Sequence, residues 1–240
     1  MIPRPLSNRR ALVTGASRGI GAATARALAS AGAHVAVTAR TQGAIDSLVA
    51  ELGPEHIAIV ADIATDAGVR AVVSATEIWA AGAPDIIVNN AGEFVYAPFE
   101  ELVVADFSRA MRLNVEAPFG VVRAFLAAMR ARGSGDIVTV GSVADRTALS
   151  GNAAYSASKF GVRAVHEVLR EETRGSGIRA ILVSPGAVNT DTWTPHEAEL
   201  GKTFPARDTM LAADDVARAI CFAVSQPAGV NVEELRVTPS

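Results

Sequence analysis

The chain between Ala11 and Gly21 reads ALVTGASRGIG. A short apolar run ends at Thr14, three glycines follow with the spacing G-x-x-x-G-x-G, and a helical pattern begins near Ile20. Glycines after a strand let the backbone turn tightly and approach a pyrophosphate, while the next helix offers free N–H groups and its positive dipole end. The glycines would also suit a plain strand-to-helix turn that needs positive φ. Their place between the first strand and the first helix predicts a dinucleotide site.

The same alternation of short β-branched runs and longer alanine-rich patterns continues along the chain. We expect strands at Ala11–Thr14, Val35–Thr38, Ile57–Val60, Ile86–Asn89, Ile137–Val140, Ile181–Ser184 and Leu235–Val237. We expect helices at Ile20–Ser30, Gln42–Leu52, Ala67–Ala80, Leu102–Arg130, Ala153–Thr173 and Asp214–Val224. Several strands are apolar on consecutive residues, as strands covered by helices on both faces must be. The pattern predicts an α/β Rossmann fold with a doubly wound parallel sheet of about seven strands.

The chain shows no repeat, linker or change of composition that would mark a second domain. Residues 1–8 are expected to form an N-terminal tail, and residues 9–240 a single domain. The longest stretch without a clear strand runs from Ala187 to Met210. A loop of that length inside a compact domain is usually functional, so residues 187–210 are predicted to form a lid over the substrate.

Composition excludes several classes of function. The 22 basic and 25 acidic side chains give a formal charge of −3, which excludes a polybasic nucleic-acid binder. No apolar stretch is long enough to cross a bilayer. The first residues contain two prolines and no apolar signal region, and the single Cys221 permits no intrachain disulfide. We therefore expect a cytoplasmic protein with no membrane partner. The four histidines are scattered without metal-ligand spacing, and no metal site is expected.

The end of the second strand, Thr38-Ala39-Arg40, bears on the choice of dinucleotide. NAD sites place there an acidic residue that binds the ribose hydroxyls, and this chain has no carboxylate at that point. Arg40 and Arg18 offer two guanidinium groups suited to a 2′-phosphate, unless both are ordinary surface arginines. We predict NADP(H) rather than NAD(H). Asp62, after the third strand, is a candidate for the adenine amino group or for a turn.

Ser142, Tyr155 and Lys159 form the most informative set. Ser142 ends the fifth strand, and Tyr155 and Lys159 lie four residues apart on one face of the next helix. The chain has only two tyrosines and two lysines, so this spacing is hard to attribute to chance. A neighbouring ammonium is expected to lower the pKa of a phenol from about 10. Tyr155 then acts as general acid–base, and Ser142 holds the substrate oxygen.

These motifs resemble those of the short-chain dehydrogenase/reductase family, in the subgroup with TGxxxGxG and YxxxK, over nearly the whole stretch from Ala11 to Thr190. The resemblance implies a catalytic tetrad of Asn114, Ser142, Tyr155 and Lys159. In that family Asn114 bends its helix and holds a water that links Lys159 to solvent. The helices Leu102–Arg130 and Ala153–Thr173 usually form dimer faces, commonly within tetramers, so a homo-oligomer is expected.

The motifs and the resemblance together assign the remaining site residues. The cofactor-binding candidates are Gly15, Ser17, Arg18, Gly19, Ile20, Gly21, Arg40, Asp62, Ile63, Asn90, Ala91, Gly92, Tyr155, Lys159, Pro185, Gly186, Val188 and Thr190. The substrate candidates are Ser142 and Tyr155, together with residues chosen from position alone: Val143, Ala187, Trp193, Glu93, Ala144, Arg146 and His196.

The function implied is an NADP(H)-dependent oxidoreductase that interconverts an alcohol and a carbonyl of a small molecule. Two alternatives remain open. A non-catalytic NADP-binding redox sensor keeps the fold without needing an activated phenol. A 3-oxoacyl reductase keeps the chemistry, although the ending from Asn231 to Ser240 lacks the Asp-Gly-Gly tail of many such reductases.

Overall fold

The computed structural model describes residues 4–196 and 205–240, and a seven-stranded sheet forms its centre. Its strands are β1 (Arg10–Thr14), β2 (His34–Ala39), β3 (Ile57–Val60), β4 (Ile86–Asn89), β5 (Gly135–Val140), β6 (Ile178–Pro185) and β7 (Glu234–Val237). The spatial order is β3-β2-β1-β4-β5-β6-β7, and each neighbouring pair is parallel. The predicted single-domain Rossmann-type fold is confirmed.

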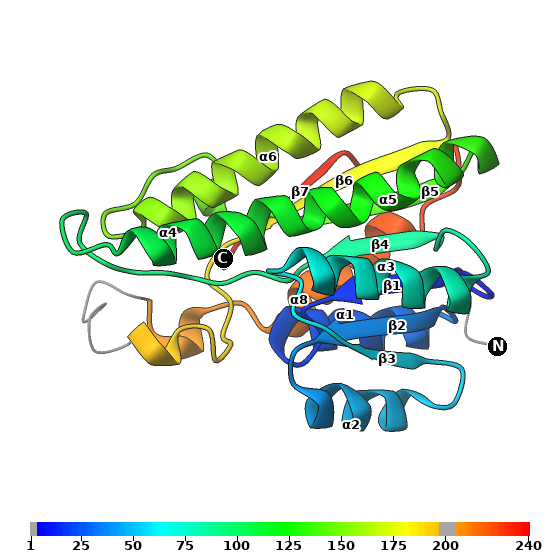
Figure 1. Cartoon of the computed structure of the whole chain (residues 1–240), viewed down its shortest axis with the longest axis horizontal. Helices are drawn as coiled ribbons and strands as arrows, with labels where there is room; N and C mark the ends of the chain where they lie inside the picture. The colour runs from blue at the N-terminus through cyan, green and yellow to red at the C-terminus, as the bar shows by residue number, and fades with distance from the viewer. Residues whose placement is uncertain (1–3, 197–204) are drawn as a thin grey trace.

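Helices cover both faces of the sheet (Figure 1). One face carries α1 (Gly19–Ser30), α2 (Gln42–Leu52) and α8 (Ala213–Val224), which bury Leu28 and Ile220 against it. The other carries α3 (Asp66–Ala80), α5 (Ala117–Arg132) and α6 (Ala153–Thr173), and Phe125 and Met129 are buried there. Because neither face meets water, β1, β4 and β5 are apolar on consecutive residues.

The single helix predicted over Leu102–Arg130 is wrong in one respect. The structure has α4 (Val104–Met111), a π turn at Arg112–Glu116 and then α5. Pro118, near the start of α5, has no N–H to donate to the carbonyl of Asn114 four residues earlier. An α-helical bond is therefore impossible at that point, and the wider turn places Asn114 in the interior, where it is buried.

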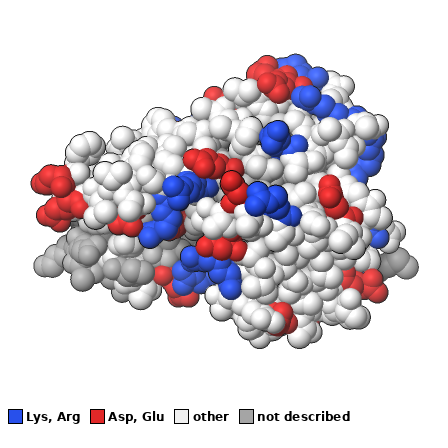
Figure 2. Space-filling view, viewed as in Figure 1, with Lys and Arg blue, Asp and Glu red and all other residues white. Residues whose placement is uncertain are grey.

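Part of the predicted N-terminal tail packs on the domain. The Leu6 side chain is buried, and its backbone N–H donates to the carbonyl of Ala31 after α1. Among the described residues, none of the helices has the length and apolar character needed to span a membrane. On the face shown in Figure 2, acidic and basic side chains are interspersed rather than grouped by sign.

Candidate active site

A cleft of about 1180 Å³ lies at the carboxyl ends of the strands. Parallel strands bring the residues that follow them to one edge of the sheet, where α/β proteins bind ligands. The predicted cofactor, catalytic and substrate residues line this cleft, with four exceptions: Gly21, Asn114, Arg146 and His196. The fold thus brings together motifs that are spread over 176 positions, from Gly15 to Thr190.

The glycine turn after β1 is packed against the turn after β4. Gly15 has φ +68°, and a Cβ there would lie 2.6 Å from the Cα of Ala91. A Cβ on Gly21 would collide with the carbonyl oxygen of Gly15. The Asn90 side-chain amide donates to the carbonyls of Thr14 (2.9 Å) and Gly15 (3.1 Å). These contacts hold the start of α1 open toward the cleft, where its N–H groups can meet an anion.

The side of the cleft beyond β2 carries positive charge. Arg18 and Arg40 both line it, and both are exposed. The only ion pair that the described residues give Arg18 is a 3.9 Å contact with exposed Asp191, and they give Arg40 none. Asp62 also lines the cleft, but its carboxylate accepts from the backbone N–H of Ala64 at 3.1 Å and so closes its own turn.

Ser142, Tyr155 and Lys159 meet at the centre of the cleft. Ser142 follows β5, and its Oγ accepts from the Ala144 N–H at 3.1 Å, which leaves the hydroxyl proton to donate elsewhere. Tyr155 and Lys159 lie one turn apart on α6, with the Lys159 Nζ 5.6 Å from the centre of the Tyr155 ring. The buried Lys159 Nζ donates to the Val140 carbonyl at 2.9 Å.

The expected lowering of the pKa of Tyr155 by Lys159 is not found in this structure. Burial raises the pKa of the Tyr155 phenol, hydrogen bonding with Ser142 opposes this, and the charge of Asp145 raises it further. Burial also lowers the pKa of Lys159 to about 8, against a smaller opposing effect of Asp145. Both shifts favour the uncharged form, as a poorly hydrated site must.

Asn114 supports the site from behind the wall of the cleft. Its Oδ1 accepts from the Glu93 N–H at 2.9 Å, and its Nδ2 donates to the Glu93 carbonyl at 3.0 Å. Nδ2 also donates to the Ser158 Oγ at 2.8 Å, which itself donates to the Tyr155 carbonyl. The Asn114 side chain therefore joins the segment after β4 to the turn of α6 that carries Tyr155.

The sequence analysis missed Phe94, which lines the cleft beside the phenol. Its ring centre lies 5.0 Å from that of Tyr155 and 4.7 Å from that of Trp193, edge to face in both cases. Such pairs are favourable beyond the area they bury. The available signal was an aromatic residue five positions after the end of β4, in a chain with only 5% aromatic residues.

Backbone and side-chain contacts connect the first residues of the predicted lid to one another and to Leu211, which follows it. Val188 and Leu211 form a parallel bridge, and the Trp193 indole donates to the Val188 carbonyl at 2.7 Å. Ala187, Val188, Thr190 and Trp193 line the cleft. Residues 197–204 of the predicted segment lie outside the described residues.

Two substrate candidates chosen from position do not line the cleft. Arg146 turns away and pairs with Asp145 (2.8 Å) and Glu234 (2.6 Å), because buried Asp145 requires a cation. The His196 ring lies edge to face with that of Phe94, with ring centres 5.3 Å apart, and is outside the lining. Glu93 and Ala144 do line the cleft.

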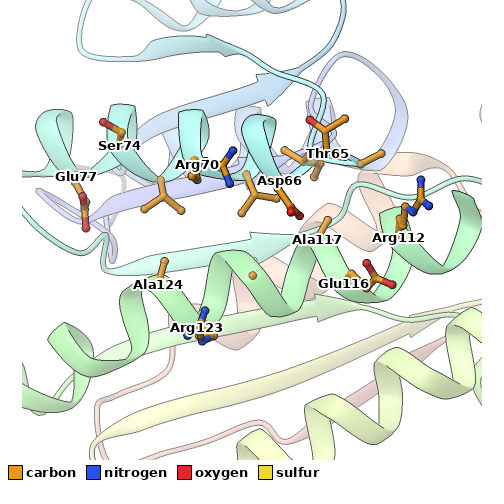
Figure 3. Close-up of a pocket in the computed structure, with 15 residues that line it drawn as sticks. Thr65, Asp66, Arg70, Ser74, Glu77, Arg112, Glu116, Ala117, Arg123 and Ala124 are labelled. Atoms are coloured by element: carbon orange, nitrogen blue, oxygen red, sulfur yellow. The ribbon is translucent and has the colours of Figure 1, made fainter.

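A second hollow of about 730 Å³ lies between α3 and α5 (Figure 3). Charged residues of both signs line it, among them Arg70 and Glu77 of α3, Glu116 of the π turn and Arg123 of α5. It shares only Ile63 with the cleft, and none of the predicted catalytic residues lines it.

The fold and this cleft define an oxidoreductase of the Rossmann type. A family model described as short chain dehydrogenase matches residues 9–201, and the chain belongs to that family.

Individual relatives are similar over nearly the whole chain. A glycine betaine reductase from Emericella nidulans is 37% identical over 99% of this chain, which spans only 19% of that protein. A D-threitol dehydrogenase from Mycolicibacterium smegmatis is 35% identical over 94% of this chain and 89% of the relative. Among solved structures, a metagenomic short-chain oxidoreductase in complex with NADP superposes with a TM-score of 0.84, at 31% identity, over 98% of this chain and 99% of that one.

We predict that Lys159→Met makes the cofactor-free protein more stable at pH 7. The pKa of Lys159 falls from 10.5 in the unfolded chain to about 8 in the fold, so below pH 8 its charge opposes folding by about 3 kcal/mol. Loss of the hydrogen bond to Val140 lowers the stability of the variant by about 1 kcal/mol. The free energy of unfolding of Lys159→Met should therefore exceed that of the wild type by about 1–3 kcal/mol.

Wild-type stability should therefore rise relative to that of the variant between pH 8 and pH 10.5, as the lysine loses its proton in the folded state. Chemical denaturation at pH 7 and pH 10 measures both effects. A variant less stable than the wild type at pH 7 would contradict the expected cost of the buried ammonium.

Proposed function

We propose that this chain transfers hydride between NADP(H) and a small molecule, and so interconverts an alcohol and a carbonyl. The observation that carries the proposal is the meeting of Ser142, Tyr155 and Lys159 in the cleft that also contains the glycine turn. A redox sensor would need the glycine turn but would not need a phenol, a serine and a buried lysine in one place. The family membership supports oxidoreductase chemistry in general.

The residues of the cleft fit a dinucleotide. The close packing at Gly15 and Gly21 leaves no room for side chains, so backbone N–H groups can approach a pyrophosphate. Arg18 and Arg40 would hold the 2′-phosphate of NADP(H). Pro185, Gly186, Val188 and Thr190 would hold the nicotinamide half. When bound, the nicotinamide supplies or accepts the hydride.

In carbonyl reduction, Ser142 and Tyr155 position the substrate oxygen. The Ser142 hydroxyl donates a hydrogen bond to that oxygen, and the Tyr155 phenol donates the proton as the alcohol forms. In alcohol oxidation the same proton returns to Tyr155. In the cofactor-free protein the raised pKa of Tyr155 keeps the phenol in the protonated form that carbonyl reduction needs, but it also makes the phenol a weaker acid. Asn114 holds the helical turn that carries Tyr155.

Tyr155→Phe should reduce turnover by roughly 10²- to 10⁴-fold, because the acid–base group is removed while the ring stays in place. NADPH affinity, measured by fluorescence titration, should change little. Tyr96→Phe is the matched control, since Tyr96 lines the cleft without a partner role in proton transfer. Turnover in Tyr155→Phe equal to that of the wild type would contradict the mechanism. Tight NADPH binding without reduction of any carbonyl would favour the redox sensor.

Arg40→Asp should weaken NADPH binding by about 10-fold or more, because a carboxylate replaces a cation that would bind the 2′-phosphate. NADH binding should change less or improve, which reverses the preference. Fluorescence titration with both cofactors measures this. Arg218→Asp is the control, since exposed Arg218 lies outside the cleft. Stronger binding of NADH than of NADPH by the wild type would overturn the assignment of NADP(H).

A second copy of this chain is the partner expected at the exposed surface of α5 and α6. Phe119 on α5 and Phe160 on α6 are 53% and 44% exposed, an unusual cost for large apolar side chains on these helices. A homo-oligomer that covers α5 and α6 would bury them. We expect native mass spectrometry to give a dimer or tetramer, and Phe119→Glu to favour the monomer. A wild-type monomer at micromolar concentration would contradict this.

A further inference from the structure

A carboxylate that belongs to none of the sequence motifs lies directly behind Ser142. Asp145 ends the short helical turn Val143–Asp145, three residues after Ser142, and is 1% exposed. An ionised carboxylate in such a place is costly unless it is paired and hydrogen-bonded. Its partners therefore indicate what it holds in position.

The two oxygens of Asp145 have different tasks. Oδ2 accepts from the backbone N–H of Ser142 at 3.3 Å and from the Ser184 hydroxyl at 2.5 Å. Oδ1 accepts from the Arg146 Nε at 2.8 Å and lies 3.6 Å from an Arg163 guanidinium nitrogen. One oxygen thus fixes the backbone of Ser142 and the end of β6, and the other binds two arginines.

The arginines connect Asp145 to the last strand of the sheet. Glu234, the first residue of β7, binds Arg146 at 2.6 Å and Arg163 at 3.3 Å. Two carboxylates and two guanidinium groups balance in charge, and the cluster joins α6, the Ser142 turn and β7. We call Asp145, Arg146, Arg163 and Glu234 the Asp145 cluster.

We propose that Asp145 is a positioning residue for hydride transfer, which holds Ser142 at the distance from Tyr155 that the substrate oxygen requires, and that Glu234 supports it from β7. This inference rests on the proposed function of Ser142 and Tyr155. The Ser142 Oγ is already bound to the Ala144 N–H, so the turn is fixed at both ends and only the hydroxyl proton is free to move. Displacement of a catalytic group by about 1 Å can cost about 100-fold in rate.

The charge of Asp145 gives this role a second measurable effect. It raises the pKa of both Tyr155 and Lys159, so its removal should lower the pKa of the phenol. The other charged groups that face Asp145 are Arg146, Arg163 and, through them, Glu234. Nearby His166, which the charges of Arg163 and Glu234 also affect, has a pKa lowered to about 4 by burial and stays neutral above pH 5.

The sign of the expected pH effect follows from these contacts. In carbonyl reduction the phenol must hold its proton, so activity falls as pH rises through the pKa of Tyr155. Neutralising Asp145 leaves the positive charges of Arg146 and Arg163 less compensated, and the phenol then loses its proton at lower pH. The alkaline limb of the pH profile should therefore move to lower pH.

The test compares Asp145→Asn, Glu234→Gln and Glu167→Gln in NADPH-dependent carbonyl reduction. Asp145→Asn should lower kcat by about 10- to 100-fold and shift the alkaline limb to lower pH, with NADPH affinity retained. Glu234→Gln should change both in the same direction by less. Glu167→Gln is the matched control: Glu167 binds the same Arg163, at 2.8 Å, but has no contact with Asp145 in the structure. It should match the wild type.

A double-mutant cycle with Ser142→Ala separates positioning from mere folding. If Asp145 acts through Ser142, adding Asp145→Asn to Ser142→Ala should cost much less than it costs the wild type. Additive losses together with an unmoved pH limb would overturn the proposal. If Asp145→Asn does not fold, Glu234→Gln decides, and kcat and a pH profile equal to those of Glu167→Gln would overturn it.

Different results would contradict the proposed function and the role of Asp145. Turnover that is lost in Tyr155→Phe establishes the proposed function independently of Asp145. Normal kinetics in Asp145→Asn would then remove only the role of Asp145. A wild-type chain that binds NADPH and reduces no carbonyl would overturn both.

Discussion

Burial of the Lys159 ammonium is the constraint on which the rest of the site depends. The ammonium is buried, and among the described residues it donates one hydrogen bond, to the Val140 carbonyl at the end of β5. Burial lowers its pKa to about 8 and raises the pKa of Tyr155, so in the cofactor-free protein both groups resist ionisation. The sheet core, packed on both faces, must offset the cost of keeping this lysine dry.

Two buried ionic clusters hold β5 and β6 at their opposite ends. At the amino ends, Arg179 of β6 binds both oxygens of Asp136 of β5, at 2.5 and 2.6 Å. At the carboxyl ends, Asp145 joins the Ser142 turn to Ser184 of β6. These contacts restrain β5 and β6 relative to one another at both ends. The position of Ser142 is therefore set by its contacts with the sheet rather than by a free loop. This rigidity is what a donor to a reacting oxygen requires.

The sequence predicts most of the fold because buried parallel strands and amphipathic helices leave strong local signals. Each of the seven strands was predicted close to its observed bounds, and the spacing from Tyr155 to Lys159 placed both side chains on one face of α6. The π turn at Asn114 was missed, although Pro118 four residues later was the signal for it. Phe94 contacts His196, 102 positions later, and Arg146 beside Asp145 pairs with Glu234, 88 positions later; no local sequence pattern indicates such contacts.

The division between catalysis and specificity follows from where these contacts lie. Ser142, Tyr155 and Lys159 are positioned by the strand ends and α6, elements fixed by the core. The wall beyond them depends on Phe94, whose ring lies edge to face with Tyr155 on one side and with Trp193 of the predicted lid on the other. A change at Phe94 or Trp193 therefore alters the space next to the phenol without moving the hydrogen bonds of Ser142 or Lys159. On the proposed function, the aromatic wall would select the substrate, and the residues at the sheet edge would set the type of reaction.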